Sequence, residues 1–292
     1  MQTEIDGALE SAGRNLSISL FRSGSGVISR RASISSNTVT LTDPQDIVAF
    51  ENGMTLGASA TDGGGSTRTG SAKVVAIDRS NGTLTLDNAA GIASFANNDY
   101  LFVVGDYDKS LKGFAAWLPM VAPTSGDNFF GVDRSKDVTR LAGVRFDGSA
   151  LPINEALQKG ASVIAREGGK VDTCVMNFDN YAELEIALGA KVQYIEYKVG
   201  ELGFQAMRIN GPRGTIKVIA DQDCQSDRAY MLKLDTWKLY SIGPAVKILE
   251  LDDNKTPEEE PILILAVPVS AFLNVTLPLG FKLKPYVVTP VA

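Results

Sequence analysis

Few residues in this sequence could perform catalysis, because none of its 292 residues is a histidine. A Ser-His-Asp or Cys-His nucleophile, a histidine-ligated zinc ion and an imidazole pH switch are therefore excluded. Lysine or carboxylate catalysis survives this exclusion, but no pair of acids stands out among the 34 aspartate and glutamate residues. A two-carboxylate glycosidase, and an enzyme of any kind, are thus the least favoured interpretations. We expect a protein with no catalytic residues and no cofactor.

Three short motifs resemble binding loops but lack part of the required pattern. Residues 63–66 (GGGS) have no following Gly-Lys-Ser/Thr, which a phosphate-binding P-loop needs. Residues 210–214 (NGPRG) could hold a phosphate at Arg213, but the flanking strands favour an ordinary hairpin. Residues 221–227 (DQDCQSD) are the densest cluster of oxygen ligands, yet the spaced glycine and distal glutamate of a calcium loop are missing. We predict no metal site there, with an adventitious divalent ion as the alternative.

The two cysteines and the overall charge restrict the function further. Cys174 and Cys224 provide neither a disulfide framework nor the spacing of a metal site. We expect a buried thiol at 174 and a loop thiol at 224, both in a reducing compartment. A net charge of −6 argues against tight binding to nucleic-acid phosphates. No segment reaches the ~18 uninterrupted apolar residues of a membrane span, so we predict no membrane partner.

The elements that must position these residues change in character along the chain. Residues 5–21 carry apolar side chains at steps of three to five, which predicts a helix, and residues 23–26 (SGSG) end it.

From Ile34 to Gly105 the period becomes two, and five short strand-like runs are separated by turns. Asn81-Gly82 predicts a tight hairpin in which both residues have positive φ. Asp43 and Pro44 predict the start of a short helix. This region is expected to form a small β-barrel or sandwich.

After Gly105 the pattern indicates an α+β arrangement. Residues 152–169 predict a helix that begins near Pro152 and ends at two glycines. Residues 172–177 predict a buried strand, and Asn177 or Asp179 is expected to cap a second helix that ends at Gly189. Four further strand-like runs follow, in residues 192–198, 203–209, 215–221 and 229–235. Alternation around Trp237 predicts a packed strand, and Trp117 is expected to anchor a linker.

The order of these elements, together with three motifs, resembles the major capsid proteins of tailed phages, which have the Hong Kong 97-like capsid fold. LFRSGSG resembles the end of the family's long spine helix. DTCVMNFDNYAELEIALG resembles the strand-asparagine-helix element of the axial domain. DQDCQSDRAYMLKLDTWKLYSIG followed by KILELDDNK resembles the strand that returns to the peripheral domain. The motifs cover residues 4–256.

This resemblance implies an α+β fold with axial and peripheral domains and an inserted small β-domain. Residues 1–33 would hold the spine helix of the peripheral domain, and residues 34–106 the inserted β-domain. Residues 107–243 would be the axial domain, and residues 244–292 the return strands of the peripheral domain. The family's N-terminal arm and extended loop have no counterpart in this sequence, which begins almost at the spine helix.

The resemblance further implies a structural protein that assembles with itself into the hexamers and pentamers of an icosahedral shell around genomic DNA. Portal and scaffolding proteins would be further partners, and contact with packaged DNA would be weak and non-specific. The protein would assemble in the host bacterial cytoplasm and reside in the virion. A virion decoration or receptor-binding β-module is the alternative. Mixed charges in residues 131–148, and the polar face of the first helix, suggest candidate subunit-interface residues: Arg134, Asp137, Arg140, Arg145, Asp147 and Arg14.

Overall fold

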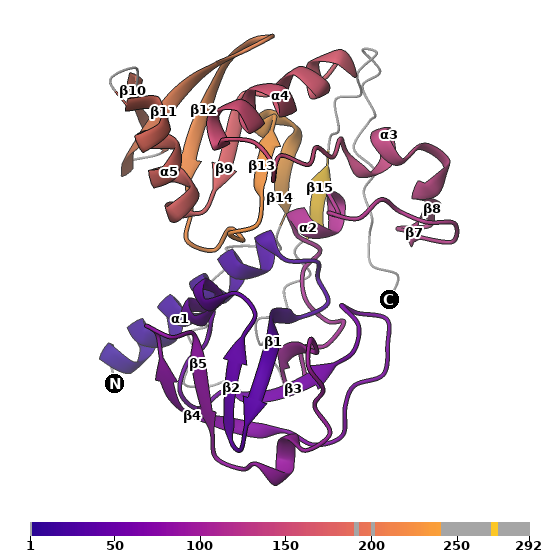
Figure 1. Cartoon of the computed structure of the whole chain (residues 1–292), viewed down its shortest axis with the longest axis vertical. Coiled ribbons are helices and arrows are strands. Elements are labelled where there is room, and N and C mark those ends of the chain that lie inside the picture. Colours follow the sequence, from indigo (N-terminus) through magenta and orange to yellow (C-terminus); the bar gives the residue numbers. More distant parts are fainter. Residues whose placement is uncertain (1, 190–192, 200–201, 241–269, 274–292) are drawn as a thin grey trace, which may run out of the picture.

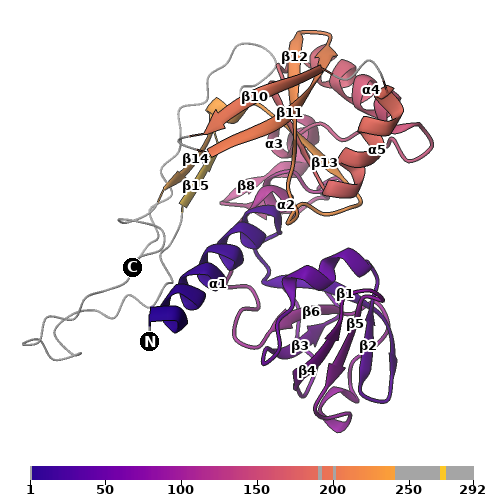
Figure 2. The same ribbon diagram turned by 90° about the vertical axis from the view of Figure 1, so that its left-hand side faces the viewer.

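The computed structural model describes residues 2–189, 193–199, 202–240 and 270–273. It contains a closed β-barrel and an α+β unit, and the first helix, α1 (Gln2–Phe21), lies between them (Figures 1 and 2). The return strands expected in residues 244–292 lie outside the described residues, except for one short strand, β15 (Ser270–Leu273). No helix in the described part of the chain is both long and apolar enough to cross a membrane.

Six antiparallel strands close the barrel in the order β1-β2-β5-β4-β3-β6. Alternating side chains point inward, as a period of two requires, and Val39, Leu56 and Leu84 are completely buried. All the buried residues of this core come from positions 39–101, within the barrel. The strands are β1 (Val27–Ser35), β2 (Thr38–Leu41), β3 (Thr55–Ser59), β4 (Ala72–Asp78), β5 (Thr83–Leu86) and β6 (Tyr100–Val103).

The sequence predicted five of these strands and missed β1, which begins before the expected boundary at Ile34. The reason is Arg31, which stands in the middle of β1 with only 2% of its surface exposed and interrupts the apolar alternation. Its guanidinium donates to Asn97 Oδ1 at 2.9 Å, while Nε and one terminal nitrogen have no hydrogen-bond partner among the residues that the structure describes. Burial lowers the pKa of Arg31, although the nearby charge of Asp99 opposes this effect.

Asp99 also fastens the long loop between β3 and β4 to the barrel. Arg68 in that loop donates two hydrogen bonds of 2.9 Å to the Asp99 carboxylate, and the Ala96 amide donates a third at 2.6 Å. Burial alone would raise the pKa of Asp99, but these bonds and the charges of Arg68 and Arg31 hold it below its usual value. The ion pair between Arg68 and Asp99 therefore holds the loop against the barrel.

The β4–β5 turn differs from the predicted one. Gly82 has a positive φ of 63°, but Asn81 does not. The Asp78 side chain instead organises the turn by accepting hydrogen bonds from the Ser80 and Asn81 amides at 3.0 and 3.2 Å. A carboxylate at the end of a strand can satisfy turn amides in this way, and the turn then needs only one left-handed residue.

The α+β unit is built on a five-stranded sheet of order β10-β11-β12-β9-β13, in which β9 pairs in parallel with β12. Two helices cover one face, α4 (Ile153–Arg166) and α5 (Phe178–Leu188) (Figure 1). Asn177 caps α5 through a hydrogen bond from the Asp179 amide, and Gly189 follows with φ 50°, as predicted. The strands are β9 (Thr173–Met176), β10 (Gln193–Val199), β11 (Leu202–Gly211), β12 (Gly214–Ala220) and β13 (Ala229–Leu232).

The opposite face of this sheet packs against the end of α1. Alternation along β9 directs Cys174 and Met176 toward α4 and α5, whereas Val175 belongs to a cluster with Phe21 at the end of α1. Phe114 of α2 (Phe114–Trp117) completes this cluster, with its ring centroid 5.5 Å from that of Phe21. The first helix is therefore part of the core of the α+β unit.

The remaining elements lie at the edge of this unit. Trp237 lies in β14 (Trp237–Tyr240), which pairs with β15, and its ring contacts Phe114 with 4.7 Å between centroids. The packed strand predicted around Trp237 is thus confirmed. Trp117 ends α2 and contacts the short hairpin that follows. The elements between α2 and α4 are β7 (Asn128–Phe129), β8 (Val132–Asp133), a 3-10 turn η3 (Arg134–Asp137) and α3 (Val138–Ala142).

Candidate functional site: the joint between the barrel and the α+β unit

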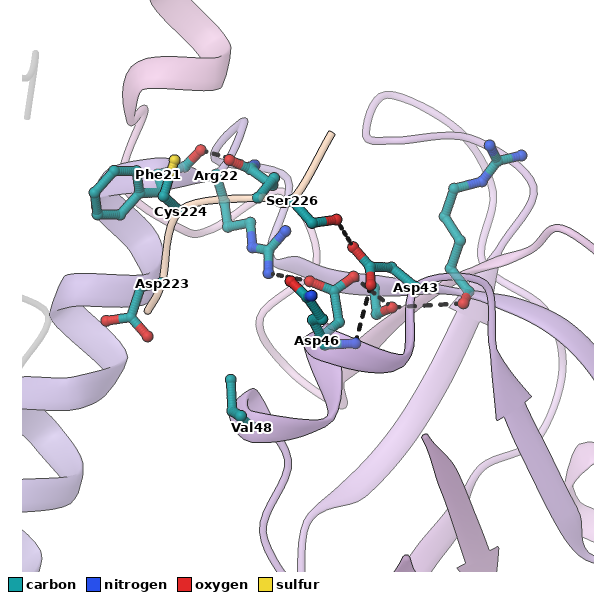
Figure 3. A network of polar contacts seen from close by, with 12 residues as sticks. Phe21, Arg22, Asp43, Asp46, Val48, Asp223, Cys224 and Ser226 are labelled. Atoms are coloured by element: carbon teal, nitrogen blue, oxygen red, sulfur yellow. Dashed lines mark hydrogen bonds and ion pairs between the residues drawn. The ribbon is translucent and has the colours of Figure 1, made fainter. Parts of the chain in front are cut away.

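A short 3-10 helix, η1 (Pro44–Ala49), lies between β2 and β3 and contacts parts of the chain outside the barrel (Figure 3). The Asp43 side chain caps η1 by accepting a hydrogen bond of 2.9 Å from the Gln45 amide, and Pro44 occupies the first position. Both features were predicted from the sequence. Because proline at this position needs no hydrogen-bond acceptor, the Asp43-Pro44 pair fixes where η1 starts.

Arg14 of α1 and Arg22, which follows α1, bind η1 and its neighbours. Arg22 donates to Asp46 at 2.8 Å, and both side chains are only about 15% exposed. Asp46 also accepts a hydrogen bond of 2.7 Å from the Ser29 hydroxyl on β1. Arg14 donates to Glu51 at 3.0 Å and to the Val48 carbonyl oxygen. A partly buried pair of this kind contributes more than an exposed one, because solvent screens it less.

The third part of the joint is the loop of residues 221–227, which the sequence marked as a cluster of acids. Ser226 donates its hydroxyl hydrogen to the Asp43 carboxylate (Figure 3). Asp223 accepts from the Ser17 hydroxyl of α1 at 2.5 Å, and Gln225 donates to the Phe21 carbonyl oxygen at 3.0 Å. The loop therefore bonds both to the barrel and to α1.

Residues at the start of α5 also bind this loop through hydrogen bonds. The side-chain amides of Asn177 and Asn180 donate to the carbonyl oxygens of Cys224 and Ser226 at 3.0 and 2.8 Å. Asp179 accepts a hydrogen bond from the side chain of Gln45 in η1. Asn177 thus has two roles, since it caps α5 and also holds the loop that reaches the barrel.

The joint has the chemistry of a structural contact. Burial raises the pKa of Asp221, although a hydrogen bond from the Asp223 amide opposes the shift. Within the described residues, no three histidine, cysteine, aspartate or glutamate side chains are grouped so that they could hold a metal ion. Asp221, Asp223 and Asp227 of the loop each accept at least one hydrogen bond, while Asp223 Oδ1 is buried with no partner among the described residues.

The two cysteines lie beneath this joint. Cys174 is completely buried, as predicted, but Cys224 is also buried, with 2% exposure, although it lies in a loop. Its sulfur faces the Val175 carbonyl oxygen at 3.9 Å. Burial raises the pKa of both thiols to about 12, so both are protonated and unreactive at neutral pH. Sequence alone could not reveal this burial, because the residues around Cys224 are polar.

Comparison with known protein families identifies the chain. The family model for the SU10 major capsid protein matches residues 68–258, which is more than half of the 292 residues. The chain belongs to this family. The match begins in the loop between β3 and β4, so it includes part of the barrel as well as the α+β unit. Neither the curated proteins nor the solved structures that were compared gave a match.

Membership in this family makes the chain a phage major capsid protein, as the sequence resemblance predicted. A major capsid protein is a structural component of the virion, and it associates with itself to form the shell. These general properties agree with the sequence-based interpretation that the protein is not an enzyme.

Three of the six candidate interface residues of this capsid protein are arginines whose side chains donate hydrogen bonds to backbone carbonyl oxygens of the same chain. Arg134 is buried at 7% exposure, with hydrogen bonds to the Ala116 carbonyl oxygen at 2.6 Å and to both Asp127 oxygens at 3.1 Å. Arg145 donates to the Val138 and Ala142 carbonyl oxygens at 2.9 and 3.2 Å. Arg14 belongs to the joint. The structure therefore gives these three arginines positions that stabilise the subunit itself.

The other three candidates lie closer to the surface. Asp137 caps α3 and lies 3.6 Å from Arg140, and each of the two side chains is 43% exposed. Asp147 is exposed and accepts a hydrogen bond of 3.0 Å from the Ser149 amide. The assignment of all six residues to a subunit interface stays a prediction.

Sequence reasoning missed the residues that make the joint, most notably Arg22, Asp46 and Ser226. Asp43 and Ser226 are separated by 183 positions, so no local pattern connects them. The sequence signals were the caps at Asp43-Pro44 and Asn177 and the acidic cluster of residues 221–227, and none of them indicated what it would contact.

Proposed function

We propose that this capsid protein assembles into the hexamers and pentamers of an icosahedral shell that encloses genomic DNA. The family match over residues 68–258 carries this proposal. The order of a helix, a barrel and an α+β unit supports it, because the same order underlies the resemblance to the Hong Kong 97-like capsid fold.

In this proposal the α+β unit, within residues 107–243, is the axial domain around the centre of each ring. Helix α1, within residues 1–33, is the spine helix, and residues 244–292 return to the peripheral domain. The barrel is a small domain inserted after the spine helix, at residues 34–106 with the addition of β1. The joint would hold it at one orientation, so that every subunit presents the barrel in the same way.

The proposed partners follow from this role. The protein would bind copies of itself, portal and scaffolding proteins, and it would assemble in the host bacterial cytoplasm before residing in the virion. The net charge of −6 favours at most weak, non-specific contact with packaged DNA, because phosphate binding requires clustered cations. The protein would act without a catalytic step.

Negative-stain electron microscopy of the purified full chain tests the proposal. We expect rings, sheets or closed shells whose proportion rises with protein concentration, because association follows mass action. A particle that stays strictly monomeric at every concentration, and that binds instead to a preformed shell or to a glycan, would contradict the proposal. The same sample in size-exclusion chromatography separates assembly from non-specific aggregation.

A further inference from the structure

The hairpin of β7 and β8 exposes apolar side chains on a strained turn. Phe130 and Gly131 form the turn with φ values of 49° and 81°. A positive φ is rare for a bulky residue and persists only where the surroundings enforce it. Phe130 and Val132 are each 50% exposed, and we call these two residues the hairpin patch.

Contacts at the base of the hairpin hold it rigidly. Trp117 stacks on Phe130 with 5.4 Å between ring centroids and meets the edge of Phe129 at 4.7 Å. The Arg134 guanidinium lies 4.3 Å from the centre of the Phe129 ring while it binds Asp127. A preorganised aromatic tip loses little conformational entropy on binding, which is typical of the residues that dominate protein interfaces.

A second apolar surface lies on the outer side of α5. Ile186 is 82% exposed and Phe178 is 53% exposed, and we call these residues the α5 patch. Of the ten large apolar side chains that are exposed in the described part of the chain, six lie on α5 or in the segment that runs from the end of α2 through β8. In Figure 1, α5 and the hairpin occupy opposite edges of the α+β unit.

The surface beside the hairpin patch carries both signs of charge, whereas the outer side of α5 carries acids. Lys136, which follows the hairpin, is 79% exposed, and its nitrogen lies 3.8 Å from the nearest Asp133 oxygen. Arg140 pairs with Asp137 at 3.6 Å across the same surface. Exposed pairs of this kind contribute little, so both cations can engage another partner. The outer side of α5 carries the acidic residues Glu183 and Glu185, which are exposed beside Ile186.

We propose that the hairpin patch of one subunit docks on the α5 patch of a second copy of the chain, with Lys136 and Arg140 facing the acids of α5. The two patches differ and lie at opposite edges, so the contact is heterologous. Contacts of this type propagate from subunit to subunit and close into a ring when the rotation between subunits permits. This inference rests on the proposed function, since it names the surfaces through which the capsid protein would associate.

A cross-linking experiment tests this geometry directly. The double variant Phe130→Cys/Ile186→Cys, treated with a short bis-maleimide, should give a ladder of covalent oligomers on a denaturing gel. An equimolar mixture of the two single variants should give dimers only, because each chain then carries one of the two partner positions. Cys174 and Cys224 are buried with raised pKa values and should not react, and the unmodified chain controls for this.

Two results would overturn the inference. Dimers from the Phe130→Cys variant alone would show that like patches meet, as in a two-fold symmetric contact. Absence of a ladder from the double variant would show that the two patches do not meet. Both results can occur while the unmodified chain still forms rings or shells, and the proposed function would then survive without this contact.

Surface variants provide a second, independent measurement. Phe130→Asp and Ile186→Asp should each reduce the assembled fraction in sedimentation velocity at least tenfold. Val75→Asp is the matched control, because Val75 is 49% exposed on the barrel strand β4, away from both patches. Melting temperatures equal to that of the unmodified chain would establish that the variants fold. Assembly of Phe130→Asp at the unmodified level would contradict the proposal, whereas an unmodified chain that never assembles would contradict the proposed function itself.

Discussion

Arg134 holds the base of the β7–β8 hairpin through contacts of three kinds. It donates a hydrogen bond to a backbone carbonyl oxygen, forms an ion pair with Asp127 and lies over the Phe129 ring. Hydrogen bonds to a buried charged group contribute roughly 1.5–3 kcal/mol, more than those between neutral groups. Arg134 is therefore a charged residue of the subunit interior.

Replacement of this side chain should destabilise the protein. We expect Arg134→Met to lower the free energy of unfolding by about 2 kcal/mol, because the Ala116 carbonyl oxygen and Asp127 lose their donor. The measurement is urea denaturation followed by tryptophan fluorescence, since Trp117 packs against the same hairpin. Arg140→Met is the control and should change the value by less than about 0.5 kcal/mol, because Arg140 is exposed. Equal effects of the two substitutions would refute this role for Arg134.

At the scale of elements, η1 makes several of the contacts that hold the barrel against the rest of the subunit. It is only six residues long, yet its cap and its first turn contact Arg22 after α1, the loop of residues 221–227 and the start of α5. Each of these contacts is a single hydrogen bond or ion pair, so each contributes little alone. Their combination joins parts of the chain that lie far apart in the sequence.

The Arg22–Asp46 pair permits a quantitative test of the joint. A double-mutant cycle with Arg22→Ala and Asp46→Ala should give a coupling energy of about 1–2 kcal/mol, because both side chains are mostly buried. The same cycle on Lys159 and Glu155, an exposed pair on α4 with 3.7 Å between the charges, should give less than about 0.5 kcal/mol. Unfolding in urea measures both cycles. A coupling for Arg22 and Asp46 no larger than for the α4 pair would show that η1 is not fastened through this contact.

The sequence predicted an element correctly where its buried positions carry apolar residues and its other positions carry polar ones. The strands β2 and β5 alternate between buried and partly exposed positions, so their period of two was visible. The helix α5 carries its own cap and terminator. β1 was missed because Arg31 is buried in the barrel wall, where apolar residues are expected, and no pattern of neighbours predicts such a charge.

At the scale of the whole molecule, the chain enters and leaves the barrel at neighbouring positions. The strands that enter and leave it, β1 and β6, pair with each other. A methyl group on Gly26 would lie 2.2 Å from the Asp106 carbonyl oxygen, and the Asp108 amide donates to the Ser25 carbonyl oxygen at 2.8 Å. Gly26 also has a φ of 79°, which glycine adopts readily and other residues rarely adopt. Both the close approach and the positive φ therefore require glycine at this position. This connection supports the proposal of an inserted domain.

The barrel should therefore fold when it is separated from the rest of the chain. We expect a fragment of residues 24–108 to unfold cooperatively on heating, because no described residue from outside the barrel belongs to its apolar core. Circular dichroism and calorimetry provide the measurement. Leu84→Ala in the same fragment should lower its stability by about 2–5 kcal/mol, since Leu84 is completely buried. A fragment without a cooperative transition would show that the barrel depends on the joint for its stability.

The sequence by itself determined the local elements, the absence of histidine chemistry and the resemblance to phage capsid proteins. These properties depend on periodicity, caps and residue types, which act over a few neighbouring positions. Only the tertiary structure decided that Arg134 and Cys224 are interior residues and that Asp43 meets Ser226. Burial and long-range hydrogen bonds depend on which distant segments meet, and a chain of 292 residues allows far more pairings than local pattern can distinguish.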